Sequence, residues 1–303
     1  MNDPIYIFDG GFEGLLTALA LAVAAGALSA RFVPAGAPGA AGQGDLFSLP
    51  LRVIADSERA GVFMDRVRNE ISDGAAGCVL QLWWAEQPEL FTPLHEYLAL
   101  GFKHGPGVNG FRTHPAVRTV IQAARKVGLE AHRLMGLLRF RELADGSLYA
   151  PVSPDANVAL VLGWHFRQRL AGERWVIHDL RRGLGVFWDG RRLESCEIAS
   201  GPAWAAAGTP APAAAAPSRS ALPAGRRAET RYDEAPSPAA SSMEVSEGGG
   251  VWSVREAQIQ ELWKSFFGAV AIPERHNPEQ QRRCMPRRYW KYLVEIPQEQ
   301  GAG

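Results

Sequence analysis

Three histidines and two carboxylates in the centre of the chain are the side chains best suited to proton transfer or metal binding. Histidine titrates near neutral pH and can act as an acid, a base or a metal ligand. The candidates are His132, His165, His178, Asp179 and Glu130. They suggest a hydrolytic or lyase site if the fold brings them together.

The spacing of these residues does not require convergence. The sequence has no His-Glu-x-x-His pair, and the adjacent residues His178 and Asp179 fall in a predicted strand, where their side chains would point to opposite faces. Hydrogen-bonded structural histidines are the alternative interpretation. The sequence leaves a catalytic role open and predicts neither a metal nor a cofactor.

Cations and aromatic rings alternate in the C-terminal stretch Met285-Pro-Arg-Arg-Tyr-Trp-Lys-Tyr-Leu. Guanidinium groups can pair with phosphates, and rings can stack on unpaired bases with about 1–3 kcal/mol per base. The nucleic-acid-binding candidates of this stretch are Arg287, Arg288, Tyr289, Trp290 and Lys291. The alternative is that the aromatic residues anchor the core while the arginines are solvated or form salt bridges.

A second basic group surrounds a predicted hairpin strand at residues 138–143. Arg139 and Arg141 would share one face of that strand, because alternate residues point the same way. Further cations in nearby segments are Arg133, Arg167 and Arg169. Together they predict a concave positive surface, although a solvated sheet face explains the same pattern.

The charge distribution supports a one-sided binding face, although the formal net charge of the chain is zero. Residues 125–141 contain five basic residues against one acid, and residues 275–291 contain six against one. Clustered cations release counterions when they bind a polyanion. DNA, single-stranded or damaged, is therefore the predicted partner.

Cysteine usage and hydropathy favour a cytoplasmic protein. The three cysteines, Cys78, Cys196 and Cys284, lie far apart and show no disulfide or metal-ligand spacing. The apolar stretch at residues 15–28 is too short to cross about 30 Å of hydrocarbon, and no basic residue precedes it as in a signal peptide. We predict a buried helix there and no membrane partner.

The N-terminal segment Asp9-Gly-Gly-Phe-Glu-Gly14 lies between a predicted strand and a predicted helix. Backbone N–H groups at such a place can face an anion. The segment matches neither G-x-G-x-x-G nor the P-loop pattern. A tight turn with Asp9 capping the helix is the favoured interpretation.

The helices and strands predicted around the candidate residues indicate an α+β fold. A strand at residues 5–8 precedes helices near 12–25, 56–71, 79–98 and 114–135. A hairpin turning at Asp145-Gly146, a helix near 157–170 and strands at 175–177 and 186–188 follow, giving a short central antiparallel sheet.

Residues 200–250 are dominated by Ala, Pro, Ser and Gly, and cannot bury enough apolar surface to offset the entropy of ordering. They predict a long disordered insertion. The expected organisation is an α+β core over residues 1–199, this insertion, and a basic helical segment at 251–303. That last segment is predicted to pack back and complete the same domain.

Four ordered blocks carry a family resemblance. They read YIFDGGFEGLLT at 6–17, RKVGLEAHRLMGLLRF at 125–140, HFRQR with WVIHDLR within 165–181, and ERHNP with MPRRYWKYL within 274–293. In this order they resemble a bacterial family of DNA-metabolism proteins, over nearly the whole chain except the insertion. Gly11 departs from the pattern, because relatives commonly have serine there.

The resemblance implies a domain of unknown biochemical function, typically encoded beside a radical-SAM protein of DNA modification or repair. Some relatives are fused to a domain similar to uracil-DNA glycosylases. No such domain follows Gly303, so we expect no base-excising activity from this chain.

Three functional hypotheses follow. The first is a DNA-associated accessory protein that presents a basic, aromatic face and acts with a radical-SAM partner, which would hold the iron–sulfur chemistry. The second is a nucleic-acid-processing enzyme that uses a His/Asp site. The third is a protein–protein adapter without direct DNA contact, whose cations bind an acidic partner.

Overall fold

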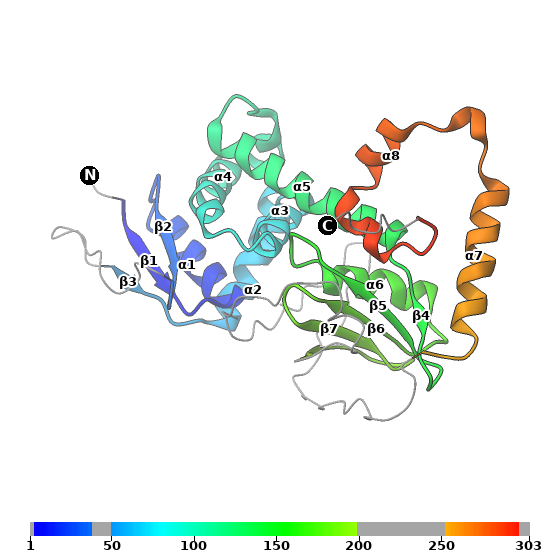
Figure 1. Cartoon of the computed structure of the whole chain (residues 1–303). Helices are drawn as coiled ribbons and strands as arrows, with labels where there is room; N and C mark the ends of the chain where they lie inside the picture. The colour runs from blue at the N-terminus through cyan, green and yellow to red at the C-terminus, as the bar shows by residue number, and fades with distance from the viewer. Residues whose placement is uncertain (1–2, 38–49, 199–251, 297–303) are drawn as a thin grey trace. The chain divides into compact units, whose positions relative to one another are not determined.

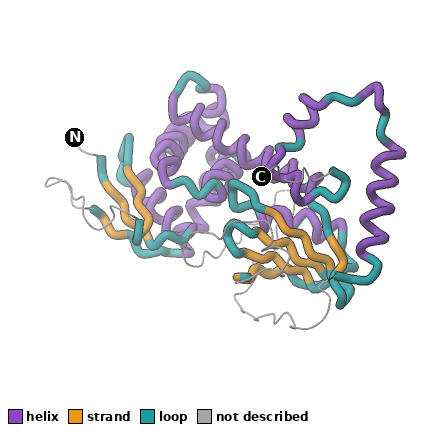
Figure 2. The backbone as a smooth tube through the Cα atoms, viewed as in Figure 1, coloured by secondary structure: helices purple, strands orange, loops and turns teal. Residues whose placement is uncertain are grey.

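The computed structural model describes residues 3–37, 50–198 and 252–296 (Figure 1). The described residues fall into two compact units, one up to Gly128 and one from Leu129 onward. Helices and strands mix in both units (Figure 2). The predicted α+β class is confirmed. The expected single core over residues 1–199 spans the boundary between the units, and the predicted insertion at 200–250 lies outside the described residues.

The first unit combines a three-stranded parallel sheet with helices. Its strands follow the order β2-β1-β3, with β1 central. The elements are β1 (Ile5–Phe8), α1 (Phe12–Ala24), β2 (Arg31–Pro34), β3 (Leu51–Arg52), α2 (Ser57–Arg66), η1 (Val67–Ile71), α3 (Asp73–Trp84), η2 (Pro88–Leu90), α4 (Phe91–His104) and η3 (Gly105–Gly110). The predicted strand at 5–8 and the buried helix after it are confirmed.

Helix α5 (Pro115–Leu137) begins in the first unit and ends in the second. The second unit continues with β4 (Arg141–Glu142), β5 (Leu148–Val152), α6 (Ala159–Arg169), β6 (Trp175–Asp179), β7 (Leu184–Trp188) and β8 (Leu193–Glu197). After the gap come α7 (Glu256–Val270), η5 (Pro273–Arg275), α8 (Pro278–Cys284) and η6 (Arg287–Tyr292).

The sheet of the second unit follows the order β4-β5-β6-β7-β8. The hairpin β4–β5 forms around Gly146, whose φ of 80° is unfavourable for other residues. The β5–β6 pair is parallel, because α6 carries the chain back between them, and the other pairs are antiparallel. The sheet is therefore mixed, whereas hairpin signals alone suggested only antiparallel neighbours.

Helix α6 covers one face of this sheet. A Cβ on Gly163 would lie 2.6 Å from Cγ1 of Val186, so glycine allows the close approach of helix and strand. The rings of Trp175 and Trp188 stack with centroids 6.5 Å apart, and Phe140 meets Phe166 of α6 edge-on. This apolar layer fixes β6 and β7, so His178 alternates onto the opposite face of the sheet.

Candidate nucleic-acid interface

The C-terminal segment is docked by its aromatic side chains. Tyr289, Tyr292 and Leu293 are buried, with Tyr289 only 1% exposed, and η6 contacts β5. Burial raises the pKa of Tyr292 to about 12, so its phenol stays neutral. The predicted return of this segment onto the α+β unit is confirmed, and Tyr289 is a core anchor with no ring face presented to solvent.

Glu130 of α5 collects the hydrogen bonds that hold this segment. Its buried carboxylate accepts from Nη2 of Arg288 at 2.7 Å and from the Tyr289 hydroxyl. It also accepts from the backbone N–H groups of Asp155 at 3.0 Å and Ala156 at 2.9 Å. Glu130 is therefore fully engaged as a structural carboxylate, which leaves it no role in a catalytic cluster.

Arg288 is committed to the same network. Nη1 pairs with the carboxylate of Asp155, and Nη2 also donates to the Tyr289 hydroxyl at 2.7 Å. Burial lowers the pKa of Arg288, but the hydrogen bond with Tyr289 and the charges of Asp155 and Glu130 raise it overall. This arginine holds the fold together, which differs from the phosphate-binding role predicted for it.

Arg139 is also paired inside the unit. Its Nη2 lies 2.5 Å from Oε1 of Glu295, and its guanidinium carbon lies 5.4 Å from the ring centroid of Trp263. Burial raises the pKa of Glu295, but the hydrogen bond and charge of Arg139, together with hydrogen bonds from the backbone and Trp263, lower it overall.

Arg139 and Arg141 do not form the predicted basic face of one strand. Since α5 runs to Leu137 and β4 begins only at Arg141, Arg139 lies outside the strand and the alternation rule does not apply to it. Arg141 stands over the ring of Trp252 at 5.5 Å, and burial lowers its pKa.

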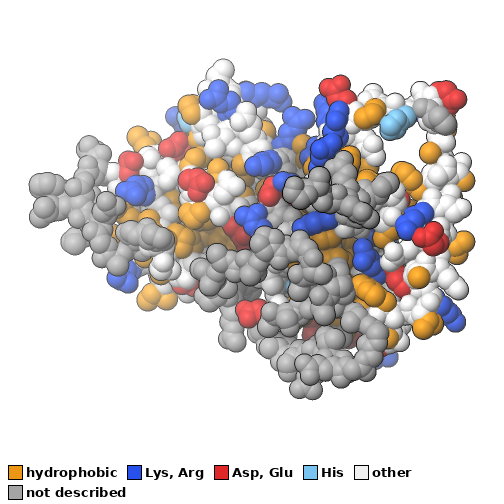
Figure 3. Space-filling model, viewed as in Figure 1, with side chains coloured by type: hydrophobic (Ala, Val, Ile, Leu, Met, Phe, Trp, Pro, Cys, Tyr) orange, Lys and Arg blue, Asp and Glu red, His pale blue; other side chains and the backbone are white. Residues whose placement is uncertain are grey.

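Four of the exposed cations of α8 and η6 have no ionic partner in the described residues. None of them forms an ion pair with any residue in the described ranges, and the acid between Arg275 and Lys291 is Glu279. They are Arg282, Arg283, Arg287 and Lys291. Basic side chains are visible beside α8 on the face that Figure 3 shows. Arg287 and Lys291 were predicted for this role, and the two α8 arginines were counted only as local charge.

Trp290 is the aromatic partner of one of these cations, Arg287. Its ring is half-buried, and its Nε1 donates to the carbonyl of Met285 at 2.8 Å, which fixes the ring orientation. The guanidinium of Arg287 lies 5.6 Å from the ring centroid. A cation held over a partly open ring gives one surface both phosphate-pairing and stacking capacity.

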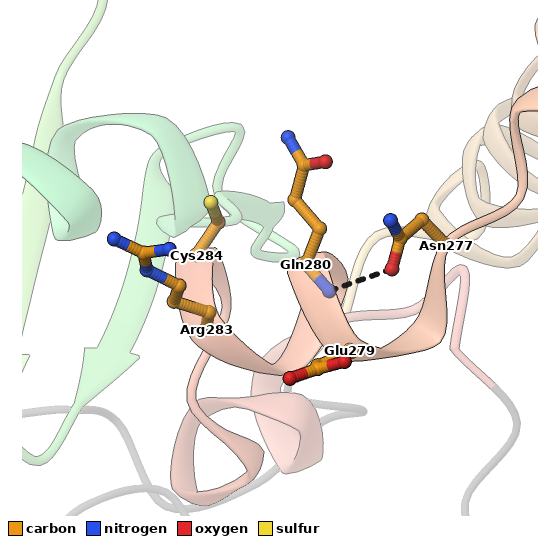
Figure 4. Close-up of a pocket in the computed structure, with 5 residues that line it drawn as sticks. All are labelled: Asn277, Glu279, Gln280, Arg283 and Cys284. Atoms are coloured by element: carbon orange, nitrogen blue, oxygen red, sulfur yellow. Dashed lines mark hydrogen bonds between the residues drawn. The ribbon is translucent and has the colours of Figure 1, made fainter.

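A small hollow lies against α8 (Figure 4). Its lining is Asn277, Glu279, Gln280, Arg283 and Cys284. Asn277 caps the helix by accepting from the backbone N–H of Gln280 at 2.9 Å. In Figure 4 the side chains of Arg283 and Cys284 lie together at one end of the hollow, away from Glu279.

The remaining predicted cations lie elsewhere in the unit. Arg167 and Arg169 belong to α6, which covers one sheet face through Gly163 and Val186. Strand alternation places His178 on the opposite face, with Tyr149. Tyr292 of η6 interacts electrostatically with Tyr149, so η6 lies on that opposite face too. The two α6 arginines and the η6 cations therefore do not share one face.

Arg133 of α5 is half-buried and follows Glu130 by about one helical turn. It belongs to the helix side on which the C-terminal segment docks. Among the cations of the second basic group predicted from the sequence, Arg133 lies closest in sequence to Glu130, the carboxylate that holds η6.

The three histidines occupy different environments. His132 is exposed on α5, and His165 is half-buried on α6 with its ring edge-on to Phe166. His178 is buried in β6, where Nδ1 lies 2.6 Å from the hydroxyl of Tyr149. Burial lowers the pKa of His178 to about 4, so it is neutral at physiological pH.

Asp179 also has a structural environment. Its fully buried carboxylate accepts from Nη1 of Arg182 at 2.8 Å and from the backbone N–H of Arg181 at 2.9 Å. Burial raises its pKa against the effect of Arg182. Across residues 3–37, 50–198 and 252–296, no group of three or more His, Cys, Asp or Glu side chains is placed to hold a metal ion.

The N-terminal turn is closed by its own acid. Asp9 Oδ1 accepts from the backbone N–H of Gly11 at 2.9 Å, and Gly10 has a φ of 88°. A Cβ on Gly14 would lie 2.0 Å from Asp9 Oδ1, so this glycine makes room for the carboxylate. A carboxylate already occupies the start of α1, where an anion would have to bind.

The comparisons with known proteins identify a family and no chemistry. A family model described as "Domain of unknown function (DUF4130)" matches residues 88–295. The chain belongs to this family. Searches of curated proteins and of solved structures gave no match.

The family match begins in η2 of the first unit and extends almost to the end of the described C-terminal segment. It therefore includes both the network around Glu130 and the exposed cations. No helix in the described part of the chain is both long enough and apolar enough to span a membrane.

Proposed function

We propose that this chain is a DNA-associated accessory protein, whose contact surface is the exposed side of α8 and η6. The observation that carries the proposal is the set of four exposed cations within ten residues, unpaired in the described part of the chain, beside the half-buried ring of Trp290. Buried Tyr289 and Tyr292 hold the segment, so the cations project from a fixed backbone.

Single-stranded DNA is the substrate class that this surface favours. Unpaired bases expose ring faces that can stack on Trp290, while phosphates can pair with the arginines. Recognition through the phosphate backbone and base stacking is proposed in place of sequence readout.

The proposed setting follows from the resemblance of the four sequence blocks. The chain would act in the cytoplasm beside a radical-SAM protein of DNA modification or repair, which would supply the cofactor chemistry. The DNA-facing surface proposed here would bring the strand to that partner.

Binding of a fluorescent single-stranded oligonucleotide, followed by anisotropy at low salt, tests the proposal. The variant Arg282→Gln/Arg283→Gln/Arg287→Gln/Lys291→Gln should bind at least about tenfold more weakly than the wild-type protein, because four phosphate-pairing charges are lost. A duplex of the same length should bind more weakly than the single strand.

The matched control is Arg167→Gln/Arg169→Gln, which removes two cations from α6 on the other sheet face. Its affinity for the oligonucleotide should stay within about twofold of wild type, apart from a small loss of long-range attraction. Equal losses in both variants would show that only net charge matters and would defeat the proposed surface.

A further inference from the structure

Helix α7 carries an apolar face that stays open. Six large hydrophobic side chains of this helix are between 37% and 71% exposed. They are Ile259, Leu262, Trp263, Phe266, Phe267 and Val270. The charged pair Glu261 and Lys264, joined at 2.7 Å, lies on another side of the helix. Contiguous apolar surface of this extent on a folded domain marks an interaction site.

The helix is held to its own unit mainly at one edge. Glu256 is buried at its start and accepts from the backbone N–H of Glu142 at 2.8 Å, and Trp263 lies under Arg139. No other described helix or strand makes more than slight contact with α7. Figure 1 shows α7 as a separate arm of the second unit, and hydrophobic side chains are visible along it in Figure 3.

The spacing of the six apolar residues reads the same in both directions. When the helix is paired with a reversed copy of itself, Ile259 falls opposite Val270, Leu262 opposite Phe267, and Trp263 opposite Phe266. An interface with two-fold symmetry needs a surface of this self-complementary kind. Steps of three and four residues also form the ridge that packs against a neighbouring helix.

We infer that two copies of this chain associate through an antiparallel pairing of their α7 helices. No like charges meet across the pairing, because Glu261 and Lys264 point away from the seam. If all of the exposed surface of these six side chains is covered, roughly 600 Å² per copy would be buried, somewhat below the 800 Å² per partner of a standard interface. This inference does not rest on the proposed DNA binding.

Sedimentation equilibrium of the full chain in the micromolar range tests the inference. The wild-type protein should have the mass of a dimer. The variant Leu262→Glu/Phe266→Glu should raise the dimer dissociation constant at least about a hundredfold, because each copy would have to bury two unpaired charges. The control Glu261→Gln/Lys264→Gln should remain dimeric.

Circular dichroism should show that both variants keep the wild-type helix content. If the glutamate variant loses structure, Leu262→Ala/Phe266→Ala serves in its place and should weaken dimerisation by at least about tenfold. The inference would be overturned if the wild-type protein were monomeric across the micromolar range. It would also be overturned if the glutamate and alanine variants were folded and dimerised as tightly as the wild-type protein.

Discussion

Two neighbouring residues, Arg287 and Arg288, show how differently the C-terminal segment uses its cations. Both are exposed, but Arg288 is paired with Glu130 and Asp155, whereas Arg287 lies over the ring of Trp290. Successive residues of a 3₁₀ helix point about 120° apart, so the two side chains cannot face the same way. A run of cations therefore contains both structural and surface members.

The same division extends to the rest of the unit. Arg139 and Arg182 each pair with a carboxylate that is nearly or fully buried, while Arg282, Arg283 and Lys291 are exposed. Exposed cations remain available to phosphates, but those in internal pairs would first have to abandon a buried acid. The arginines paired with acids, which we call the inward group, should therefore determine stability. The exposed, unpaired cations, the outward group, should determine DNA affinity.

The largest predicted effect is at the centre of the inward group. Glu130→Ala should lower the free energy of unfolding by about 3–5 kcal/mol, because it leaves Arg288, Tyr289 and two backbone N–H groups without their acceptor. Chemical denaturation of the variant measures this. Glu279→Ala on exposed α8 is the control and should change stability by less than about 0.5 kcal/mol. Similar losses of unfolding free energy in the two variants would contradict the distinction between the inward and outward groups.

The next largest predicted effect is a loss of stability at acid pH, caused by the buried histidine His178. The pKa of His178 is about 4 in the folded chain and about 6.5 when unfolded, so the unfolded state binds more protons between these values. Stability should therefore fall as the pH drops from about 6.5 to about 4, by up to roughly 3 kcal/mol from this residue.

Unfolding curves at several pH values, compared between wild type and His178→Gln, measure that contribution. The variant should show a shallower decline across the same pH window, whatever its stability at neutral pH. Parallel curves for the two proteins would mean that His178 is not held neutral in the interior.

A smaller effect separates the two adjacent arginines. Arg288→Ala should cost about 1–3 kcal/mol of stability, because buried Glu130 loses a charged donor, whereas Arg287→Ala should cost less than about 0.5 kcal/mol. Thermal denaturation monitored by circular dichroism gives both values. Among variants that remain folded, Arg287→Ala should weaken oligonucleotide binding more than Arg288→Ala does. If Arg288→Ala were as harmless to the fold as Arg287→Ala, the inward role would be wrong.

Local signals were enough to predict much of the fold. Periodicity placed the strand at 5–8 and most helices, and the Asp145-Gly146 turn placed the β4–β5 hairpin. The parallel pairing of β5 with β6 was not predicted, because pairing direction depends on how α6 packs between them. The start of β4 was also missed, since residues 138–140 belong to no helix or strand and the strand begins only at Arg141.

The candidate site was predictable only as a region. Charge counts marked the segment around Arg287, but they could not identify Glu130, Asp155 and Glu295 as the acids that neutralise neighbouring arginines. Those partners lie far away in sequence and meet only after folding. The sequence did offer one signal, since it allowed Tyr289 to be a core anchor with arginines in salt bridges.

The salt dependence of single-stranded DNA binding tests the central claim most directly. The slope of log affinity against log salt should become shallower by about 0.7 for each phosphate-pairing cation removed. The fourfold glutamine variant at Arg282, Arg283, Arg287 and Lys291 should therefore lose roughly 3 from the wild-type slope, while Arg167→Gln/Arg169→Gln leaves it nearly unchanged. An unchanged slope in the fourfold variant would contradict the assignment of DNA binding to this surface.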